Sequence, residues 1–244
     1  MQTQQETIAV SIVVPAYNEE ANLSSTLHDM AQYLNTQDYT YEVIVVDDGS
    51  TDKTSEIAHA LAPLFSRCKI LKNETNRGKG YAVKKGSLSS QEELMLFMDA
   101  DNATRICHLK EFIEAARQGY DLVIGSRRLK DSKVIRRQPF LRRVLGTAYI
   151  LLSGLILGIK VKDYNCGFKL FRRDAARQLF SQLTRHDWSF DSELIYLAKK
   201  ARFKIKEVPV TWEDRKTTSK VRPFRDSINS FQSLLAIRFA SRKP

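Results

Sequence analysis

Short apolar runs alternate with amphipathic stretches through the first half of the chain. The run at 8–14 is continuous and rich in β-branched residues, as in a strand buried on both faces. Strands that alternate with helices are typical of an α/β fold with a mostly parallel sheet. The same alternation predicts strands at 8–14, 41–46, 68–71, 94–98 and 122–124, and helices at 23–34, 50–61, 82–88 and 109–116.

This rhythm changes in the second half. A long apolar helix is predicted at 140–159, another helix near 191–201 and a β-branched segment at 203–212. We therefore expect a mixed sheet with an antiparallel member, flanked by helices. No stretch rich in Pro, Gly or Ser marks a linker, so residues 1–244 are expected to form a single domain.

The predicted helix at 140–159 is unusually apolar. Residues 144–159 include no charged side chain, and basic residues flank them. Sixteen helical residues rise about 24 Å, short of the ~30 Å hydrocarbon core of a bilayer, so a full span is not expected. A second apolar face with basic neighbours follows at 223–239. We interpret both segments as amphipathic helices at a membrane surface, with a buried core helix as the alternative for the first.

Positive charge is concentrated in the second half of the chain. The formal net charge is +11, yet residues 1–125 carry 11 Lys and Arg against 18 Asp and Glu, whereas residues 126–244 carry 28 against 10. Such a basic half attracts nucleic acid, an anionic membrane or a phosphorylated substrate. A merely well-solvated surface is the alternative.

Cysteine content and the N-terminus bear on location. Cys68, Cys107 and Cys166 form no CxxC pair, which favours a reducing compartment over a disulfide scaffold. Residues 1–7 lack the basic and apolar regions of a secretory signal. The protein is therefore expected on the cytoplasmic side of a membrane.

Acidic and small polar residues end three of the predicted strands. Ligands of open α/β sheets lie beyond the carboxyl ends of the strands, so these ends predict one crevice that holds a metal ion and a nucleotide. The residues in question are Tyr17 and Glu19 after the first strand, Asp47 and Asp48 at the end of the second, and Asp99 and Asp101 after the fourth.

Asp99 and Asp101 are the candidate metal ligands. Positions i and i+2 face the same way where a strand ends, so both carboxylates can reach one Mg²⁺ or Mn²⁺. Such an ion can bridge the two phosphates of a nucleotide sugar and neutralise the charge that builds up on the leaving group. A solvated turn is the alternative for a DxD pattern alone.

The other two strand ends suggest a nucleoside pocket. A flat aromatic ring such as Tyr17 can stack on a base, and carboxylates such as Glu19, Asp47 and Asp48 accept hydrogen bonds from a base N–H or from ribose hydroxyls. A loop aromatic, a helix N-terminal acid and a turn with an N-cap are the respective structural alternatives.

The segment 76–80, Asn-Arg-Gly-Lys-Gly, resembles a phosphate loop. It matches neither GxGxxG nor the P-loop pattern, which lowers support for a dehydrogenase or an NTPase. Its glycines permit close approach of the backbone to a ligand, and Lys79 or Arg77 can supply positive charge beside a diphosphate.

Taken together, these residues resemble the family 2 glycosyltransferases of GT-A fold, and within them the polyprenyl-phosphate hexose synthases. The resemblance runs from Ile8 to about Lys220. Its second-half motifs look most like dolichyl-phosphate glucosyltransferases, with the mannosyl branch as a close competitor. These motifs are Gly125-Ser126-Arg127, the Asp163–Arg172 stretch with its CGFKLF core, Phe190-Asp191-Ser192-Glu193-Leu194, Glu207-Val208-Pro209-Val210 and Ser219-Lys220.

The resemblance implies a role for each matching position. It divides the chain into a nucleotide-binding half, 1–125, and a basic half, 126–244, that faces acceptor and membrane. Donor binding is implied for Pro15, Tyr17, Glu19, Asp47, Asp48, Lys79, Asp99 and Ala100, metal binding for Asp99 and Asp101, phosphate or acceptor binding for Arg127, Arg142, Ser219 and Lys220, and catalysis for Asp99, Asp101 and Asp191.

One position departs from the mannosyl pattern. That branch has a Gln two places after the second aspartate, which completes the metal site, and this chain has Ala103 there. Water or the diphosphate would have to fill that place, and the departure weighs against a mannosyl assignment.

The activity implied is an inverting transfer of a hexose from a nucleotide sugar, UDP-glucose preferred, to a polyprenyl phosphate at a membrane surface. A phosphate acceptor is already ionised near neutral pH and needs no strong base, and arginines in the second half suit it better than they suit nucleic acid. Alternatives are a GDP-mannose enzyme, and an enzyme acting on a polysaccharide or protein with Asp191 or Glu193 as base. A non-enzymatic basic scaffold is a further alternative.

Overall fold

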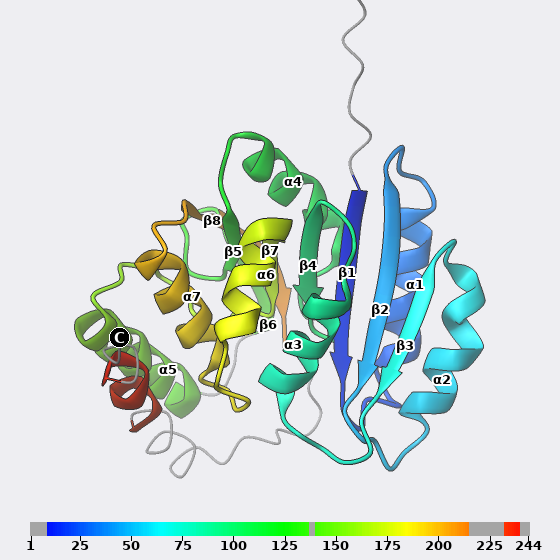
Figure 1. The fold of residues 1–244 in the computed structure, drawn as a ribbon, viewed down its shortest axis with the longest axis horizontal. Helices are drawn as coiled ribbons and strands as arrows, with labels where there is room; N and C mark the ends of the chain where they lie inside the picture. The colour runs from blue at the N-terminus through cyan, green and yellow to red at the C-terminus, as the bar shows by residue number, and fades with distance from the viewer. Residues whose placement is uncertain (1–8, 137–139, 215–231, 240–244) are drawn as a thin grey trace, which may run out of the picture.

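The computed structural model describes residues 9–136, 140–214 and 232–239, with the backbone alone at 140–142 (Figure 1). Its strands are β1 (Ala9–Ala16), β2 (Thr40–Asp47), β3 (Cys68–Lys72), β4 (Leu94–Met98), β5 (Leu122–Ser126), β6 (Lys133–Arg136), β7 (Phe168–Arg172), β8 (Ile205–Pro209) and β9 (Thr211–Glu213). Its helices are α1 (Leu23–Leu34), α2 (Thr54–Leu61), α3 (Lys79–Ser89), α4 (Leu109–Arg117), α5 (Phe140–Leu157), α6 (Arg173–Gln182) and α7 (Phe190–Lys200), with a helix at 232–239.

Seven of the strands form one mixed sheet in the order β3-β2-β1-β4-β7-β5-β8. Every pairing in it is parallel except those of β7, which runs antiparallel to β4 and β5. The carboxyl ends of β1, β2 and β4 therefore lie at one edge, and β7 begins at that same edge because Met98 pairs with Phe168. Strands β6 and β9 pair in a separate two-stranded sheet.

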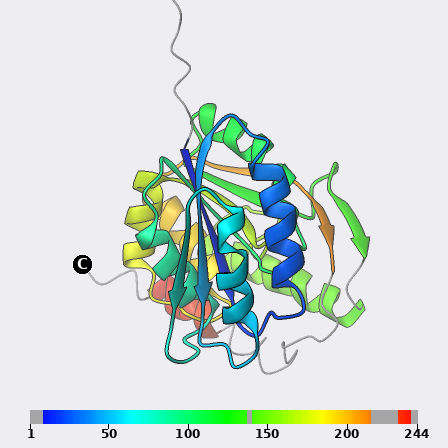
Figure 2. The ribbon, with the colours of Figure 1, turned by 90° about the vertical axis from the view of Figure 1, so that its right-hand side faces the viewer.

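Helices cover both faces of the main sheet. Figure 2, which views the sheet from its side, shows α1 and α2 on one face and α3 and α6 on the other. Alternate side chains of β1 serve the two layers, since Ile12 and Val14 pack with α1 whereas Val13 packs with α3. Burial of each such side chain contributes about 1.5–3 kcal/mol, so the two apolar layers hold the strand ends in place.

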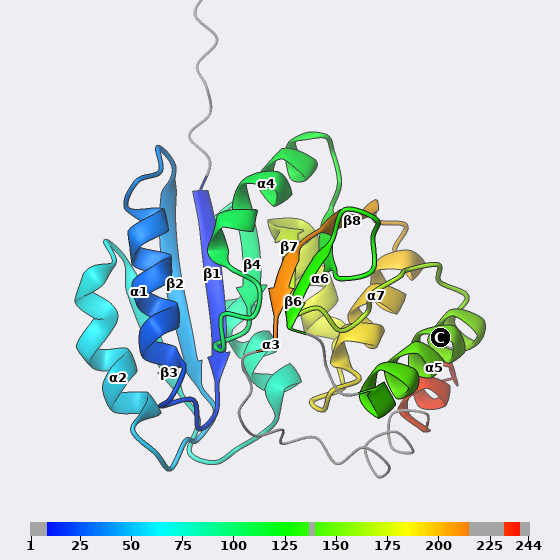
Figure 3. The same ribbon diagram turned by 180° about the vertical axis from the view of Figure 1, so that it is seen from behind.

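Helix α5 and the helix at 232–239 lie side by side at one end of the molecule (Figures 1 and 3). Leu234 and Ile237 are buried in the core layer that α7 also lines, and Tyr149 of α5 shares a 2.7 Å hydrogen bond with Ser192 of α7. Among the described residues no helix has both the length and the apolar character that a membrane span requires.

The predicted elements of the first half are confirmed, with shifted ends. Strand β4 covers 94–98 as predicted, but α3 begins at Lys79 rather than at residue 82, because Gly78 with φ of 96° turns the chain directly into the helix. The antiparallel member is β7, which no strand prediction covered. The segment 203–212 divides into β8 and the start of β9, and α6 was not predicted.

Candidate active site

The three acidic strand ends meet at one edge of the sheet. Ala16 at the end of β1 pairs with Asp47 at the end of β2, and the N–H of Asp48 donates to the Ala16 carbonyl at 2.8 Å. Strand β4, which leads to Asp99, pairs with β1 on its other side. The side chain of Thr26 in α1 donates to the Ala100 carbonyl at 2.7 Å and so anchors the turn that follows β4.

Asp99 lies against Gly167, the residue just before the neighbouring strand β7. Its backbone N–H donates to the Gly167 carbonyl at 3.0 Å. A Cβ at Gly167 would stand 2.1 Å from Oδ2 of Asp99, so only glycine leaves room for this carboxylate. About a quarter of the Asp99 side chain, 26%, is exposed, which leaves the carboxylate accessible at the sheet edge.

The Lys79 ammonium lies on this carboxylate. Its Nζ is 2.5 Å from Oδ1 of Asp99, and the side chain is 18% exposed. The rings of Phe97, Trp188 and Phe190 surround it at 5.6–5.9 Å from their centroids. Burial alone would lower the pKa of Lys79, but Asp99, Asp191 and Asp101 outweigh burial and raise that pKa above its ordinary value. Lys79 therefore keeps its positive charge in this site.

Asp101 is held in the turn beyond Asp99. It is 5% exposed, and its Oδ1 accepts a hydrogen bond from the Ala103 N–H at 3.1 Å. The residue between Asp101 and Ala103, Asn102, has φ of 54° and donates from its amide to Asp29 at 2.6 Å. These contacts fix the turn on which both candidate metal ligands lie.

The donor set fits Mg²⁺ or Mn²⁺. Carboxylate oxygens from Asp99 and Asp101 are the hard ligands such ions prefer, and an ammonium cation already lies on one of them. Within the described ranges no group of three or more Asp, Glu, His or Cys side chains is arranged for a metal ion. Mg²⁺ is commonly held by one or two carboxylates together with substrate phosphates, and two acids meet that requirement.

A second buried ion pair lies behind the first. Lys169 of β7 is fully buried; its Nζ lies 2.5 Å from Oδ1 of Asp191 and donates to the Cys166 carbonyl at 2.6 Å. Burial raises the pKa of Asp191 above its ordinary value, against the opposing effect of Lys169 and Lys79. Asp191 is therefore part of the same charge cluster as Asp99, and its proposed catalytic role stays a prediction.

Asp48 supports the loop that leads to Lys79. Its carboxylate accepts hydrogen bonds from the N–H groups of Arg77 and Gly78, at 3.0 and 2.8 Å, and from the Asn73 amide at 2.7 Å. Asp47 accepts from the Ser50 N–H at 2.8 Å, as in the turn that the sequence offered as an alternative. Both carboxylates are buried and hold the two loops beside the crevice in place.

The residues after β1 are tied to the loop after β2. Pro15 is buried within β1, and Tyr17 and Glu19 are half-buried. The Glu19 N–H donates to the Thr54 hydroxyl at 2.7 Å, and the Glu19 carboxylate accepts from the Asn22 amide at 2.8 Å. The nucleoside contacts expected of these three residues stay predictions.

Arg127, expected to contact a phosphate, is held by a carboxylate of its own. Its Nε and Nη2 donate to the two oxygens of Asp163 at 2.6 and 2.7 Å, and the guanidinium lies 5.3 Å from the Trp212 ring centroid. Burial alone would raise the pKa of Asp163, but Arg127 outweighs burial and holds that pKa below its ordinary value. The other residues expected to bind phosphate or acceptor lie outside the described residues; they are the Arg142 side chain, Ser219 and Lys220.

Gly167 and Lys169 are site residues to which sequence reasoning gave no role. Both lie in the CGFKLF motif, which supported the family resemblance but suggested no chemical role for either residue. A lysine between apolar residues of a strand was the available signal, because a buried lysine requires a buried acid. The signal for Gly167 was weaker, since no pattern shows that a glycine before one strand faces an aspartate after another.

Comparison with known proteins agrees with this geometry. The family model described as glycosyl transferase family 2 matches residues 11–180. The chain belongs to glycosyl transferase family 2. A dolichyl-phosphate beta-glucosyltransferase of Dictyostelium discoideum is 38% identical over 96% of this chain and 75% of that protein. The enzyme of the same name from Homo sapiens is 34% identical over 94% of this chain and 74% of that protein.

Solved structures agree on the fold. Glucosyl-3-phosphoglycerate synthase of Mycobacterium tuberculosis, crystallised with Mn²⁺, UDP and glucosyl-3-phosphoglycerate, superposes with a TM-score of 0.68 at 20% identity, over 96% of this chain and 79% of that chain. The GT-A fold expected from the resemblance is thereby confirmed, and this family 2 chain is a glycosyltransferase. It spans about two thirds to three quarters of the length of the dolichyl-phosphate glucosyltransferases that it matches.

Proposed function

We propose that this glycosyltransferase moves glucose from UDP-glucose to a polyprenyl phosphate of the dolichyl type at a membrane surface. The observation that carries the proposal is the Asp99, Asp101 and Lys79 cluster after the carboxyl end of β4, in a chain whose α5 and 232–239 helix also present exposed apolar side chains. The names of the curated relatives support glucose as the sugar and dolichyl phosphate as the acceptor.

The donor diphosphate belongs beside Lys79. Asp99 and Asp101 would hold a divalent ion there, which when bound neutralises charge on the diphosphate; the Mn²⁺ and UDP crystallised with the mycobacterial synthase support this. Lys79 begins α3, so its ammonium and the positive end of that helix dipole both favour an anion. Pro15, Tyr17 and Glu19 would face the nucleoside, and Asp48 would act through the 73–78 loop that it holds.

The chemical step places few demands on a base. A phosphate oxygen of the acceptor forms a bond to the anomeric carbon as the bond from that carbon to the UDP oxygen breaks, with inversion. That oxygen is ionised near neutral pH, so no proton has to be removed. Asp191 is bound to Lys169, which suits a carboxylate that balances charge better than one that takes a proton. This arrangement favours a phosphate acceptor over a sugar hydroxyl.

The acceptor lipid would reach the site from the apolar surface of α5. Val144, Leu151 and Leu155 recur along one side of this helix and are 48%, 69% and 81% exposed. Leu235 and Phe239 of the neighbouring helix are also exposed, at 37% and 56%. The exposed Arg143 and Lys160 lie at the ends of this stretch, as in helices that rest on an anionic membrane surface.

Purified protein should transfer glucose from UDP-glucose to a short-chain polyprenyl phosphate when Mg²⁺ or Mn²⁺ is present. Radiolabelled donors and extraction of the lipid product measure this directly, with GDP-mannose as the competing donor and a sugar acceptor in place of the lipid as the competing acceptor. Transfer from GDP-mannose alone would mean that the donor is GDP-mannose and not UDP-glucose. Transfer only to the sugar acceptor would replace the acceptor.

Replacing Leu151 and Leu155 together with serine is expected to weaken binding to anionic phospholipid vesicles about tenfold, because two exposed leucines would lose their place in the lipid interface. Co-sedimentation with vesicles measures the effect. Leu88→Ser is the matched control, since Leu88 is 48% exposed but lies on α3. Equal vesicle binding by the double variant and the control would mean that α5 does not contact the membrane.

A further inference from the structure

Lys79 lies where a metal ion would have to contact Asp99. Its Nζ is 2.5 Å from Oδ1 of Asp99, on a carboxylate whose other oxygen faces Gly167. Asp101 and Asp191 add negative charge around the same ammonium. A divalent ion that approached Asp99 would lie close to this ammonium, and like charges repel in a partly buried site, so the two cations compete for this carboxylate.

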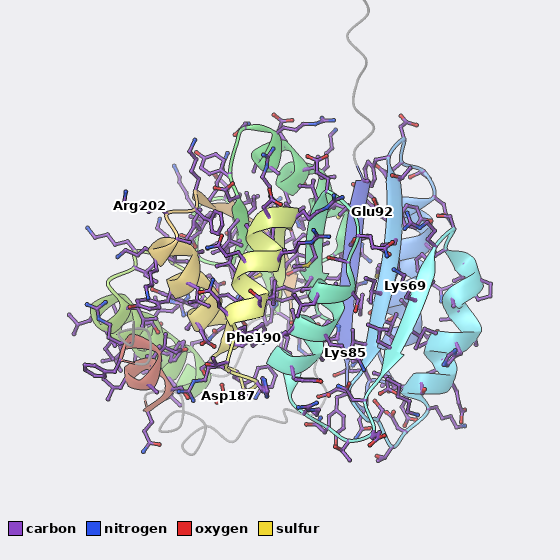
Figure 4. All side chains as sticks on the ribbon, in the orientation of Figure 1. Lys69, Lys85, Glu92, Asp187, Phe190 and Arg202 are labelled. Carbon is purple, nitrogen blue, oxygen red and sulfur yellow. The ribbon has the colours of Figure 1, made fainter. Side chains whose placement is uncertain are left out.

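The backbone of Lys79 is held rigidly. A Cβ at Gly78 would meet the His186 carbonyl oxygen at 2.4 Å, and one at Gly80 would meet the Arg185 carbonyl oxygen at 2.6 Å. The Gly80 N–H also donates to the His186 carbonyl at 2.9 Å. Figure 4 labels Asp187 and Phe190 on the segment that enters α7, next to the lower end of α3. The position of the Lys79 backbone is therefore set by packing on both sides of the residue, while its side chain extends to Asp99.

The neighbouring ion pair leaves Asp99 as the close partner of Lys79. Asp191 is in contact with Lys169, at 2.5 Å, and both side chains are almost fully buried. Lys79 in contrast lies at the sheet edge, 18% exposed, on a carboxylate that is 26% exposed. Its four-carbon side chain can turn on a fixed backbone, so an anion that arrives at this edge can draw the ammonium away from Asp99.

We propose that the Lys79 ammonium occupies the place of a divalent cation at Asp99 in the donor-free protein, so that the metal ion enters together with the donor diphosphate and not ahead of it. This inference rests on the donor site of the proposed function and adds an order of binding to it. The diphosphate supplies negative charge for both cations at once, which removes their competition for a single carboxylate. Lys79 thereby ties occupancy of the metal site to occupancy of the donor site.

Binding of Mn²⁺ alone tests this proposal without any turnover. Lys79→Met, which keeps most of the length of the side chain and removes its charge, is expected to bind Mn²⁺ at least about tenfold more tightly than the wild-type chain in the absence of nucleotide. Lys79→Arg, which keeps the charge, is the matched control and is expected to bind Mn²⁺ as weakly as wild type. Electron paramagnetic resonance of free Mn²⁺, or calorimetry, measures the dissociation constants.

Two further samples make each outcome decisive. Asp99→Asn combined with Lys79→Met is expected to lose the gained affinity, because the ion would lose its carboxylate. The second sample is the wild-type chain, so the folding of a variant is not in question. With UDP present, this chain is expected to bind Mn²⁺ at least about tenfold more tightly than UDP alone binds Mn²⁺ in solution. Unchanged or weaker Mn²⁺ binding by Lys79→Met, or wild-type binding of Mn²⁺ that UDP does not alter, would overturn the inference. Neither measurement uses the sugar or the lipid, so a failed transfer assay would not contradict the inference about Lys79.

Discussion

Asp99→Asn is expected to lower kcat/KM for glucosyl transfer about 10³-fold. The substitution preserves shape but removes the charge that Lys79 contacts and that would hold the metal ion of the proposed function, so charge on the departing diphosphate would lose its stabilisation in the transition state. It also leaves the Lys79 ammonium largely buried beside a neutral amide. Steady-state kinetics with labelled UDP-glucose and a polyprenyl phosphate measure the loss.

Asp174→Asn is the control for this prediction. Asp174 is an exposed acid in the first turn of α6, so its neutralisation changes the net charge of the protein by the same amount without touching the site. Its kcat/KM is expected to remain within about twofold of wild type. If Asp99→Asn retained turnover within tenfold of wild type, the metal and donor site would have to lie elsewhere.

Gly167→Ala is expected to lower kcat/KM about 10²-fold while the protein remains folded. The added methyl group would stand 2.1 Å from Oδ2 of Asp99, and the carboxylate must therefore move away from its position beside Lys79. A displacement of about 1 Å in a catalytic group is enough for a loss of this size. Kinetics measured together with a thermal melt separate the loss of activity from any loss of stability.

Gly146→Ala provides the matched control for Gly167→Ala. Gly146 lies in α5, where the nearest atom that the structure describes outside the helix backbone, Nη2 of Arg128, would be 3.7 Å from an added Cβ, and alanine favours a helix over glycine. This variant is expected to keep wild-type activity and to melt at the same temperature or higher. Full activity in Gly167→Ala would mean that Asp99 tolerates displacement, against the geometry described above.

The sequence predicted the parts of the fold that depend on local pattern. Continuous apolar runs located β1, β2 and β4, because strands buried on both faces need apolar residues at every position. Strand β7 has the sequence Phe-Lys-Leu-Phe-Arg, in which the lysine interrupts the run. Lys169 can be buried there because it pairs with Asp191, which is 22 residues away in the chain. No local pattern could therefore predict that strand.

In the candidate site too, local features could be predicted from the sequence and contacts between distant residues could not. Asp99, Asp101 and Lys79 could be selected from strand ends and a glycine-rich loop, since those features are local. Their mutual contact could not, because it depends on how β4, α3 and β7 pack. Arg127 illustrates the converse, since the family resemblance implied a phosphate contact, which stays a prediction, whereas the fold also gives this arginine a bidentate partner in Asp163. Charge in a sequence indicates a need for a counter-charge but does not identify it.

A crystal structure of the full chain with UDP and Mn²⁺ tests the central claim most directly. The account predicts one anomalous Mn²⁺ peak in contact with carboxylate oxygens of Asp99 or Asp101 and with the UDP diphosphate, and a Lys79 ammonium that has left Asp99 for a phosphate oxygen. UDP bound at another surface, or Mn²⁺ bound with Asp99 still paired to Lys79 and remote from the ion, would contradict it.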